Sequence, residues 1–142
     1  MARQAEAEWK GDLKGGSGRV KLGSGAYEGN YSFASRFENG TGANPEELIG
    51  AALAGCYSMA LANSLAQAGF PATSVHSSAD VHMGKDDIGF LVNLIELTVT
   101  AQVPKVDNAT FQQHVEKTNV GCIIKRALGA IPAINVKATL KN

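Results

Sequence analysis

The sequence has few cysteines, few aromatic residues and no excess of charge of either sign. Thirteen basic and thirteen acidic side chains cancel over 142 residues, and no run of like charge occurs. A chain of this kind has no electrostatic means of capturing nucleic acid or an anionic membrane surface, so we expect neither partner. Its length fits one domain, residues 1–142, with room for a hydrophobic core.

The start of the chain, MARQAE, lacks the apolar stretch of a secretory signal, so we expect a cytoplasmic protein. There are only two cysteines, Cys56 and Cys122. Where thiols are kept reduced, two cysteines are more typical of redox-active thiols than of a permanent disulfide.

Metal-binding motifs are also lacking, since neither Cys-x-x-Cys nor His-x-x-x-His occurs. His76 and His82 fall on one face of an expected strand, but about 20 Å apart at about 3.3 Å per residue. This separation is too large for one ion, and His114 lies far from both in the sequence. We therefore predict no metal and no bound cofactor.

The first part of the chain predicts β structure interrupted by glycine-rich turns. Strands are expected at residues 6–9, 19–22 and 31–37. In the last of these, Arg36 would point away from the face that carries the aromatic residues.

A strong helix start follows at Asn44, which suits the N-cap, with Pro45 at the first helical position and Glu47 placed for a capping box. The helix is expected to end at Gly69. Residues 48–62 are apolar nearly all round and rich in alanine and glycine. This pattern predicts a helix buried on all sides, with a second helix packed closely against its small residues.

The same helix is long enough to resemble a membrane span. Asn63, Ser64 and Gln67 interrupt it, and no basic segment flanks it, so we interpret it as a core helix.

The second half of the chain alternates between strand and helix patterns. Strands are expected at 75–83, 91–103 and 134–140, and helices at 109–118, capped by Asp107, and at 123–128. Three strands, a long helix, two strands, two helices and a final strand give an α+β fold with antiparallel sheets.

The cysteines are candidates for thiol chemistry, in which the thiolate is the nucleophile. Cys56 lies in mid-helix, so a cation must stabilise its thiolate, and Arg36 is the basic residue embedded in an apolar pattern. A buried guanidinium needs a carboxylate partner, and Glu46 is available. Cys122 follows Gly121 near a helix start that would stabilise its own thiolate.

Each of these residues also has an ordinary interpretation. Cys56 could be a small core residue, Arg36 a surface residue of a strand, and Glu46 an acidic residue at the positive end of a helix. The spacing alone does not decide between a thiol enzyme and a structural role.

Four segments together resemble the osmotically inducible protein C (OsmC) family. They are residues 9–13 (WKGDL), 33–38 (FASRFE), 42–52 (GANPEELIGAA) and 55–61 (GCYSMAL). The WKGDL opening is closer to the OsmC branch than to the sister branch of organic hydroperoxide resistance (Ohr) proteins. The likeness runs nearly from end to end.

The resemblance implies a thiol peroxidase of oxidative and osmotic stress defence that reduces organic hydroperoxides. It implies antiparallel sheets wrapped around a long central helix bearing Cys56, in an intertwined homodimer. Cys56 would be peroxidatic, Cys122 resolving, Arg36 the activator of the thiolate and Glu46 the partner of Arg36. An external dithiol, of lipoyl type by family likeness, would reduce the resulting disulfide.

One position departs from the family pattern, because Ile123 stands where many members have a proline after the second cysteine. An apolar wall is expected from Phe33, Phe37, Met59 and Ile123, and it would favour a bulky organic peroxide over hydrogen peroxide.

Glu46 precedes Cys56 by ten residues, a rise of about 15 Å on a continuous helix. We therefore expect either a bend between them or a site completed by Arg36 and Glu46 of a second copy. One rival interpretation is a non-catalytic dimer that binds an apolar ligand between its central helices. A second is a thiol-disulfide oxidoreductase without peroxidase action, which the lack of a Cys-x-x-Cys motif leaves without support.

Overall fold

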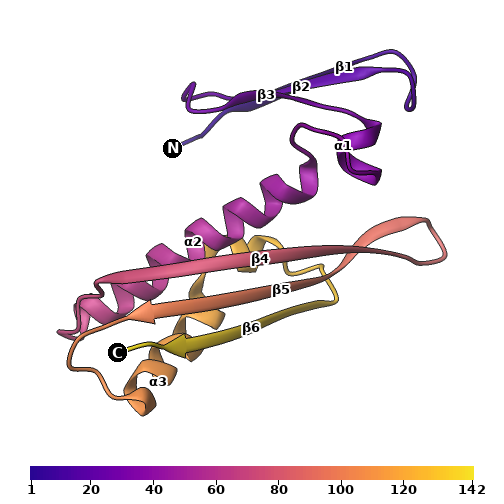
Figure 1. Cartoon of the computed structure of the whole chain (residues 1–142). Coiled ribbons are helices and arrows are strands. Elements are labelled where there is room, and N and C mark those ends of the chain that lie inside the picture. Colours follow the sequence, from indigo (N-terminus) through magenta and orange to yellow (C-terminus); the bar gives the residue numbers. More distant parts are fainter. The chain divides into compact units, whose positions relative to one another are not determined.

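The computed structural model describes all 142 residues, which form two compact units, Met1–Leu48 and Ile49–Asn142. We call them the N-terminal unit and the C-terminal unit. Three strands and a short helix belong to the first unit, and three strands and two further helices belong to the second (Figure 1). Helix α2 (Pro45–Gln67) begins in the first unit and continues through the second.

The N-terminal unit contains an antiparallel sheet in the order β1-β2-β3. Its strands are β1 (Ala5–Lys10), β2 (Ser17–Leu22) and β3 (Glu28–Tyr31). The rings of Trp9 and Tyr31 lie 5.3 Å apart on either side of Gly18, which pairs with both residues in the sheet. A side chain at Gly18 would collide with both rings, so glycine permits their contact.

The prediction of a strand over 31–37 is wrong beyond Tyr31, because residues Phe33–Phe37 form helix α1. Ser32 starts this helix: its hydroxyl accepts from the Ser35 N–H, and the Ser35 hydroxyl accepts from the Ser32 N–H. This reciprocal cap satisfies two amide groups that a helix start otherwise leaves unpaired. The helix was missed because the aromatic residues at 31, 33 and 37 alternate as in a strand.

The C-terminal unit contains a second sheet in the order β4-β5-β6. Strand β4 (Ser74–Lys85) pairs antiparallel with β5 (Phe90–Gln102), as expected. Strand β6 (Ala133–Leu140) pairs parallel with β5, so the prediction of purely antiparallel sheets is wrong. Two helices lie between β5 and β6 in the sequence, and such a crossover lets two strands run in the same direction.

These crossover helices are α3 (Asn108–Gly121) and α4 (Ile123–Ala127), close to the predicted ranges. Asp107 caps α3, as predicted, by accepting from the Thr110 N–H at 2.7 Å. The cap of α2 is also confirmed, because Asn44 Oδ1 accepts from the Glu47 N–H at 2.8 Å.

The hydrophobic core lies in the C-terminal unit. Its large, fully buried side chains come from α2, from β5 and the residue after it, and from α3. They include Leu53, Tyr57, Leu61, Leu65, Ile95, Leu97, Val99, Val103 and Phe111. The four positions from α2 are spaced by four residues and form one face of the helix. Full burial of one leucine stabilises the fold by about 1.5–3 kcal/mol.

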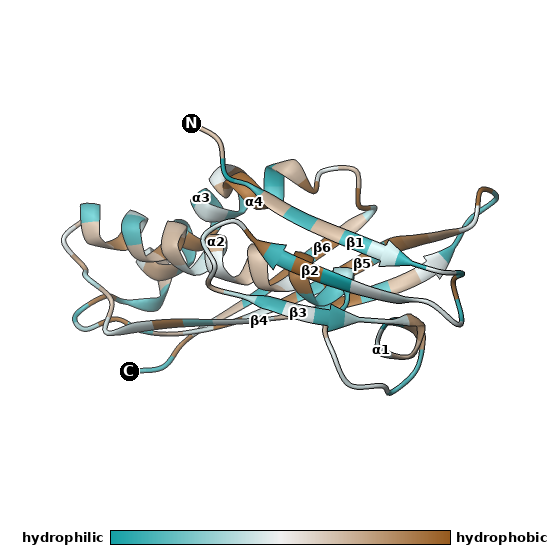
Figure 2. Ribbon diagram, turned by 90° about the horizontal axis from the view of Figure 1, so that it is seen from above, coloured by the Kyte–Doolittle hydropathy of each residue, from teal (hydrophilic) through white to brown (hydrophobic).

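The expectation that α2 is buried on all sides is wrong for the single chain. Its middle turns carry few hydrophilic residues (Figure 2), yet Ala51, Ala52, Gly55 and Met59 are exposed. By length and composition the helix could cross a membrane, a property that the core helices of folded domains share with membrane spans. Its buried face packs in the core, in keeping with the core-helix interpretation.

Candidate active site

The two cysteines, 66 residues apart in the sequence, meet in the C-terminal unit. Cys56 lies in the fourth turn of α2, and Cys122 occupies the junction that ends α3 and begins α4. Both are free thiols, and their Sγ atoms lie 3.4 Å apart. A disulfide needs a sulfur–sulfur distance of about 2.05 Å, so only a small shift separates this geometry from a bond.

The surroundings of the two thiols differ. Cys56 is half-buried, whereas Cys122 is 1% exposed. Burial raises the pKa of the Cys122 thiol, although the backbone N–H groups of Lys125 and Ile124 act in the opposite direction. The expected stabilisation of the Cys122 thiolate by its helix start is therefore outweighed. Cys122 therefore remains protonated at neutral pH.

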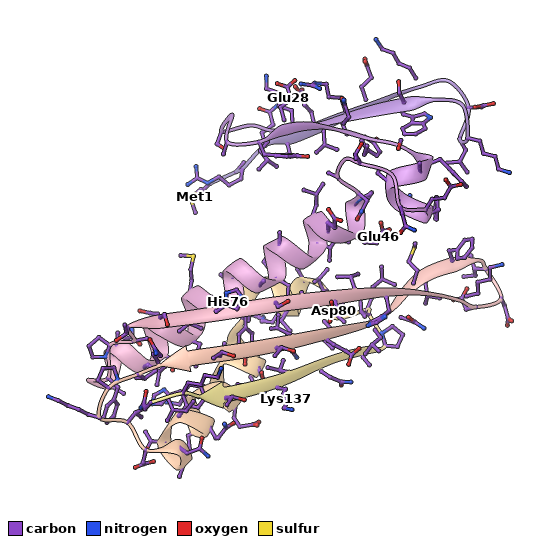
Figure 3. The ribbon with its side chains drawn as sticks, in the orientation of Figure 1. Met1, Glu28, Glu46, His76, Asp80 and Lys137 are labelled. Atoms are coloured by element: carbon purple, nitrogen blue, oxygen red, sulfur yellow. The ribbon has the colours of Figure 1, made fainter.

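A charged pair occupies the N-terminal unit. Arg36, from α1, donates to both carboxylate oxygens of Glu46. Glu46 stands in the first turn of α2, where Figure 3 labels it. The distances are 3.1 and 3.3 Å from Nε to Oε1 and Oε2, and 2.7 Å from Nη2 to Oε1. The carboxylate partner expected for Arg36 is thus in place. Such a forked contact holds the plane of the guanidinium, which a single contact does not.

The Glu46 side chain is only 12% exposed, whereas that of Arg36 is 37% exposed. The remaining surface of the guanidinium is therefore available for a further partner. Its carbon Cζ lies 5.3 Å from the centre of the Phe37 ring, within the range of a cation–π contact.

A pocket of about 220 Å³ lies beside this arginine within the N-terminal unit. Arg36 is its one charged lining residue, and the others are Trp9, Leu13, Tyr31, Ser32, Phe33 and Phe37. Phe33 and Phe37 thus line one apolar pocket, as part of the expected apolar wall. Met59 and Ile123 belong to the C-terminal unit and are 76% and 72% exposed.

Two of the three histidines have protein partners. His82 Nε2 lies 2.8 Å from Glu96 Oε1, and His114 Nδ1 lies 2.7 Å from the Ser64 hydroxyl. No group of three or more histidine, cysteine or acidic side chains is arranged to hold a metal ion.

A further contact beside the thiols was not predicted from the sequence. The buried hydroxyl of Tyr57 donates to Asn119 Oδ1 at 2.6 Å, and the carbonyl of Val115 lies 3.4 Å away. Tyr57 follows Cys56, and Asn119 precedes Cys122 by three residues. No local sequence pattern predicts a contact between two side chains that are 62 residues apart in the sequence.

Comparison with known proteins finds one family. The family described as OsmC-like protein matches residues 38–137. A curated relative, "Peroxiredoxin OsmC" of Escherichia coli strain K12, is 43% identical over 129 residues and covers 90% of each chain.

Solved structures share the fold. An organic hydroperoxide resistance protein from Elizabethkingia anophelis is 26% identical, with a TM-score of 0.70 over 100% of this chain and 98% of the other. An OsmC-like protein from Mycoplasma pneumoniae is 18% identical, with a TM-score of 0.76 over 100% of this chain and 99% of the other. The second likeness concerns the fold alone, and both agree with a mixed α+β architecture.

Proposed function

We propose, from the premise that this chain belongs to the OsmC family, that Cys56 and Cys122 reduce organic hydroperoxides through a sulfenic acid and a disulfide. The protein is a peroxiredoxin-like organic hydroperoxide reductase, an oxidoreductase of antioxidant stress defence. The observation that carries the two-thiol cycle is the 3.4 Å separation of the sulfur atoms.

In the first step the Cys56 thiolate attacks the terminal oxygen of the hydroperoxide. A sulfur–oxygen bond forms and the oxygen–oxygen bond breaks, so the alkoxide leaves and takes up a proton to become an alcohol. The sulfur is oxidised to a sulfenic acid, and the peroxide is reduced by two electrons.

In the second step the Cys122 thiol gives up its proton and attacks the sulfur of the Cys56 sulfenic acid. A sulfur–sulfur bond forms, and the hydroxyl group leaves as water. The buried, protonated state of Cys122 suits this role, because a second free thiolate would compete for peroxide. An external dithiol then reduces the disulfide by exchange, and family likeness points to a lipoyl-type donor.

Arg36 is assigned the activation of the thiolate and the peroxide. Its guanidinium stays charged in an apolar setting and has donors that do not face Glu46. The forked contact with Glu46 fixes its orientation. The aromatic pocket next to it suits the organic part of a hydroperoxide, which hydrogen peroxide lacks.

The active unit is proposed to be an intertwined homodimer with shared sites. Glu46 and Cys56 are ten residues apart on helix α2, a rise of about 15 Å, which exceeds the reach of one side chain. The exposed small residues Ala51, Ala52 and Gly55 allow a second helix to approach closely. Cys56 and Cys122 of one copy would then meet Arg36 and Glu46 of the other. We propose a cytoplasmic setting for this dimer.

The test is consumption of cumene hydroperoxide by pre-reduced protein with a dithiol present. Wild-type protein should turn over repeatedly, and Cys56→Ser should be inactive. Cys122→Ser should reduce about one equivalent of peroxide and then stall, because no thiol resolves the sulfenic acid. Mass spectrometry of that variant should find sulfenic or sulfinic acid on Cys56.

Two results would contradict this assignment. Equal loss of the first turnover in both cysteine variants would remove the division of roles. Binding of cumene hydroperoxide by wild-type protein without its consumption would instead favour a non-catalytic module that holds an apolar ligand.

A further inference from the structure

The contact between α2 and the end of α3 suggests how the second thiol is held in place. The Cys122 side chain has only the Cys56 thiol as a hydrogen-bonding partner, and the Cys122 N–H donates to the Thr118 carbonyl in the last turn of α3 at 2.9 Å. The position of its sulfur therefore depends on where that turn lies against α2.

The hydrogen bond between the two helices nearest to the thiols is that from Tyr57 to Asn119, at 2.6 Å. Its two ends are the neighbours of the thiols in the sequence, one residue after Cys56 and three before Cys122. The Tyr57 side chain is fully buried, so water does not compete for its hydroxyl.

The chemistry of this contact is fixed over the working pH range. Burial, with smaller contributions from Cys122 and Glu116, raises the pKa of Tyr57 well above its usual value. The hydroxyl therefore stays protonated and remains the donor, and the Asn119 side-chain oxygen remains the acceptor.

We propose that Tyr57 is a positioning residue for the resolving step. Through Asn119 it holds the last turn of α3 against α2, so that Cys122 Sγ stays within reach of the sulfenic acid on Cys56. The inference rests on the proposed two-thiol cycle and adds to it a residue that touches neither peroxide nor dithiol.

The same pair of helices supplies a matched control. The Ser64 hydroxyl contacts His114 Nδ1 at 2.7 Å, about two turns of α2 beyond Tyr57. Loss of this contact should weaken the packing of α3 on α2 without a direct effect on Cys122. If Tyr57 served only general packing, loss of the Tyr57–Asn119 contact and loss of the Ser64–His114 contact would slow disulfide formation equally.

The first experiment separates the half-reactions by rapid mixing of reduced protein with one equivalent of cumene hydroperoxide. In Tyr57→Phe, oxidation of Cys56 should proceed at the wild-type rate. Disulfide formation should slow about fivefold, the factor that corresponds to one ordinary hydrogen bond. Asn119→Ala should reproduce the defect, and the double variant should add little to it. Ser64→Ala should form the disulfide at the wild-type rate.

The second experiment needs no peroxide. In a redox buffer of reduced and oxidised dithiothreitol, the Cys56–Cys122 disulfide should be about fivefold less favoured in Tyr57→Phe than in wild type. If this shift occurs but wild-type protein consumes no peroxide, the proposed function is wrong and the positioning role stands.

The positioning role is overturned if disulfide rate and equilibrium are unchanged in Tyr57→Phe and Asn119→Ala. It is also overturned if Ser64→Ala shows the same loss, or if Cys56 oxidation slows as much as disulfide formation.

Discussion

The two units of the chain hold their functional pairs by different means. The thiol pair lies beside a hydrophobic core that contains nearly all the fully buried side chains, whereas the N-terminal unit buries mainly Gly18, Ser35 and Ala43. There, the charged pair is held by hydrogen bonds, a reciprocal helix cap and a contact between two aromatic rings. One unit can thus position its pair by packing, and the other relies on polar contacts.

This difference bears on the proposal that the site is shared between two copies of the chain. The C-terminal unit brings its sulfur atoms together within one chain. The N-terminal unit has a sheet face with Trp9, Val20 and Leu22, all only partly buried, and an arginine with unused donors. In the proposed dimer, a surface of another copy would cover this sheet face and interact with the free donors of Arg36.

The largest effect is expected when the charged pair is broken. Arg36→Met should lower peroxidase activity by the order of 100-fold, the loss seen when one preorganised donor is removed from an active site. Arg36→Lys should also lose much of the activity, because an ammonium is a strongly hydrated point charge and lacks the planar fork. The measurement is kcat/KM for cumene hydroperoxide, with the pH dependence of Cys56 alkylation.

The control for these variants is Arg19→Lys. Arg19, on β2, forms an exposed ion pair with Glu28, on β3. This substitution should leave the rate unchanged. An alkylation profile of Cys56 that is identical in wild type, Arg36→Lys and Arg36→Met would remove Arg36 from the site.

The next largest effect concerns stability, and the same substitution in each unit measures it. Leu61→Ala should lower the free energy of unfolding by about 3 kcal/mol, within the range for a fully buried leucine. Leu22→Ala, at a half-buried position of β2, should cost roughly 1 kcal/mol in a monomer. Urea unfolding at several protein concentrations checks both values.

These stability results also bear on the dimer. If a second copy covers the sheet, the cost of Leu22→Ala should grow with protein concentration. Equal costs in the two units at every concentration would contradict the contrast between a packed unit and an uncovered one.

The smallest effect concerns acid stability in the C-terminal unit. The Thr110 N–H holds the pKa of Asp107 below its ordinary value of 3.8. Because the folded pKa is depressed, the stabilisation is present above pH 3.8 and is lost as the pH falls through the folded pKa. Asp107→Asn keeps a capping oxygen but has no such dependence.

Thermal melts of the two proteins between pH 7 and about pH 3 check this expectation. Wild type should lose its advantage over Asp107→Asn only at the acid end. Asp87→Asn, in the exposed β4–β5 turn that caps no helix, should show no such change. A wild-type advantage that stays constant down to the lowest pH would remove the carboxylate from the cap.

Much of the fold could be predicted because its signals are local. The capping residues Asn44 and Asp107, the glycine turns and the period-two strands each depend on a few neighbouring residues. Helix α1 was missed because its short cap, Ser32 to Ser35, lies within a run of alternating aromatic residues. The parallel pairing of β5 with β6 depends on a crossover and has no local signal.

The candidate site shows the same division. Arg36 and Glu46 could be paired from the chemical need of a buried charge, and the two cysteines from the family resemblance. The raised pKa of the Cys122 thiol depends on burial, which the sequence around it does not report. The Tyr57–Asn119 contact joins two helices and requires the tertiary structure.

The central claim is that the thiol pair of one copy works with the charged pair of another. Its most direct test mixes two inactive proteins, Cys56→Ser and Arg36→Met, by unfolding them together and refolding. Random pairing makes half of the dimers mixed, each with one site that has both Cys56 and Arg36 intact. We expect peroxidase activity of roughly a quarter of wild type. If mixed dimers form, as native mass spectrometry would show, and no activity returns, the four residues act within one chain and the claim is wrong.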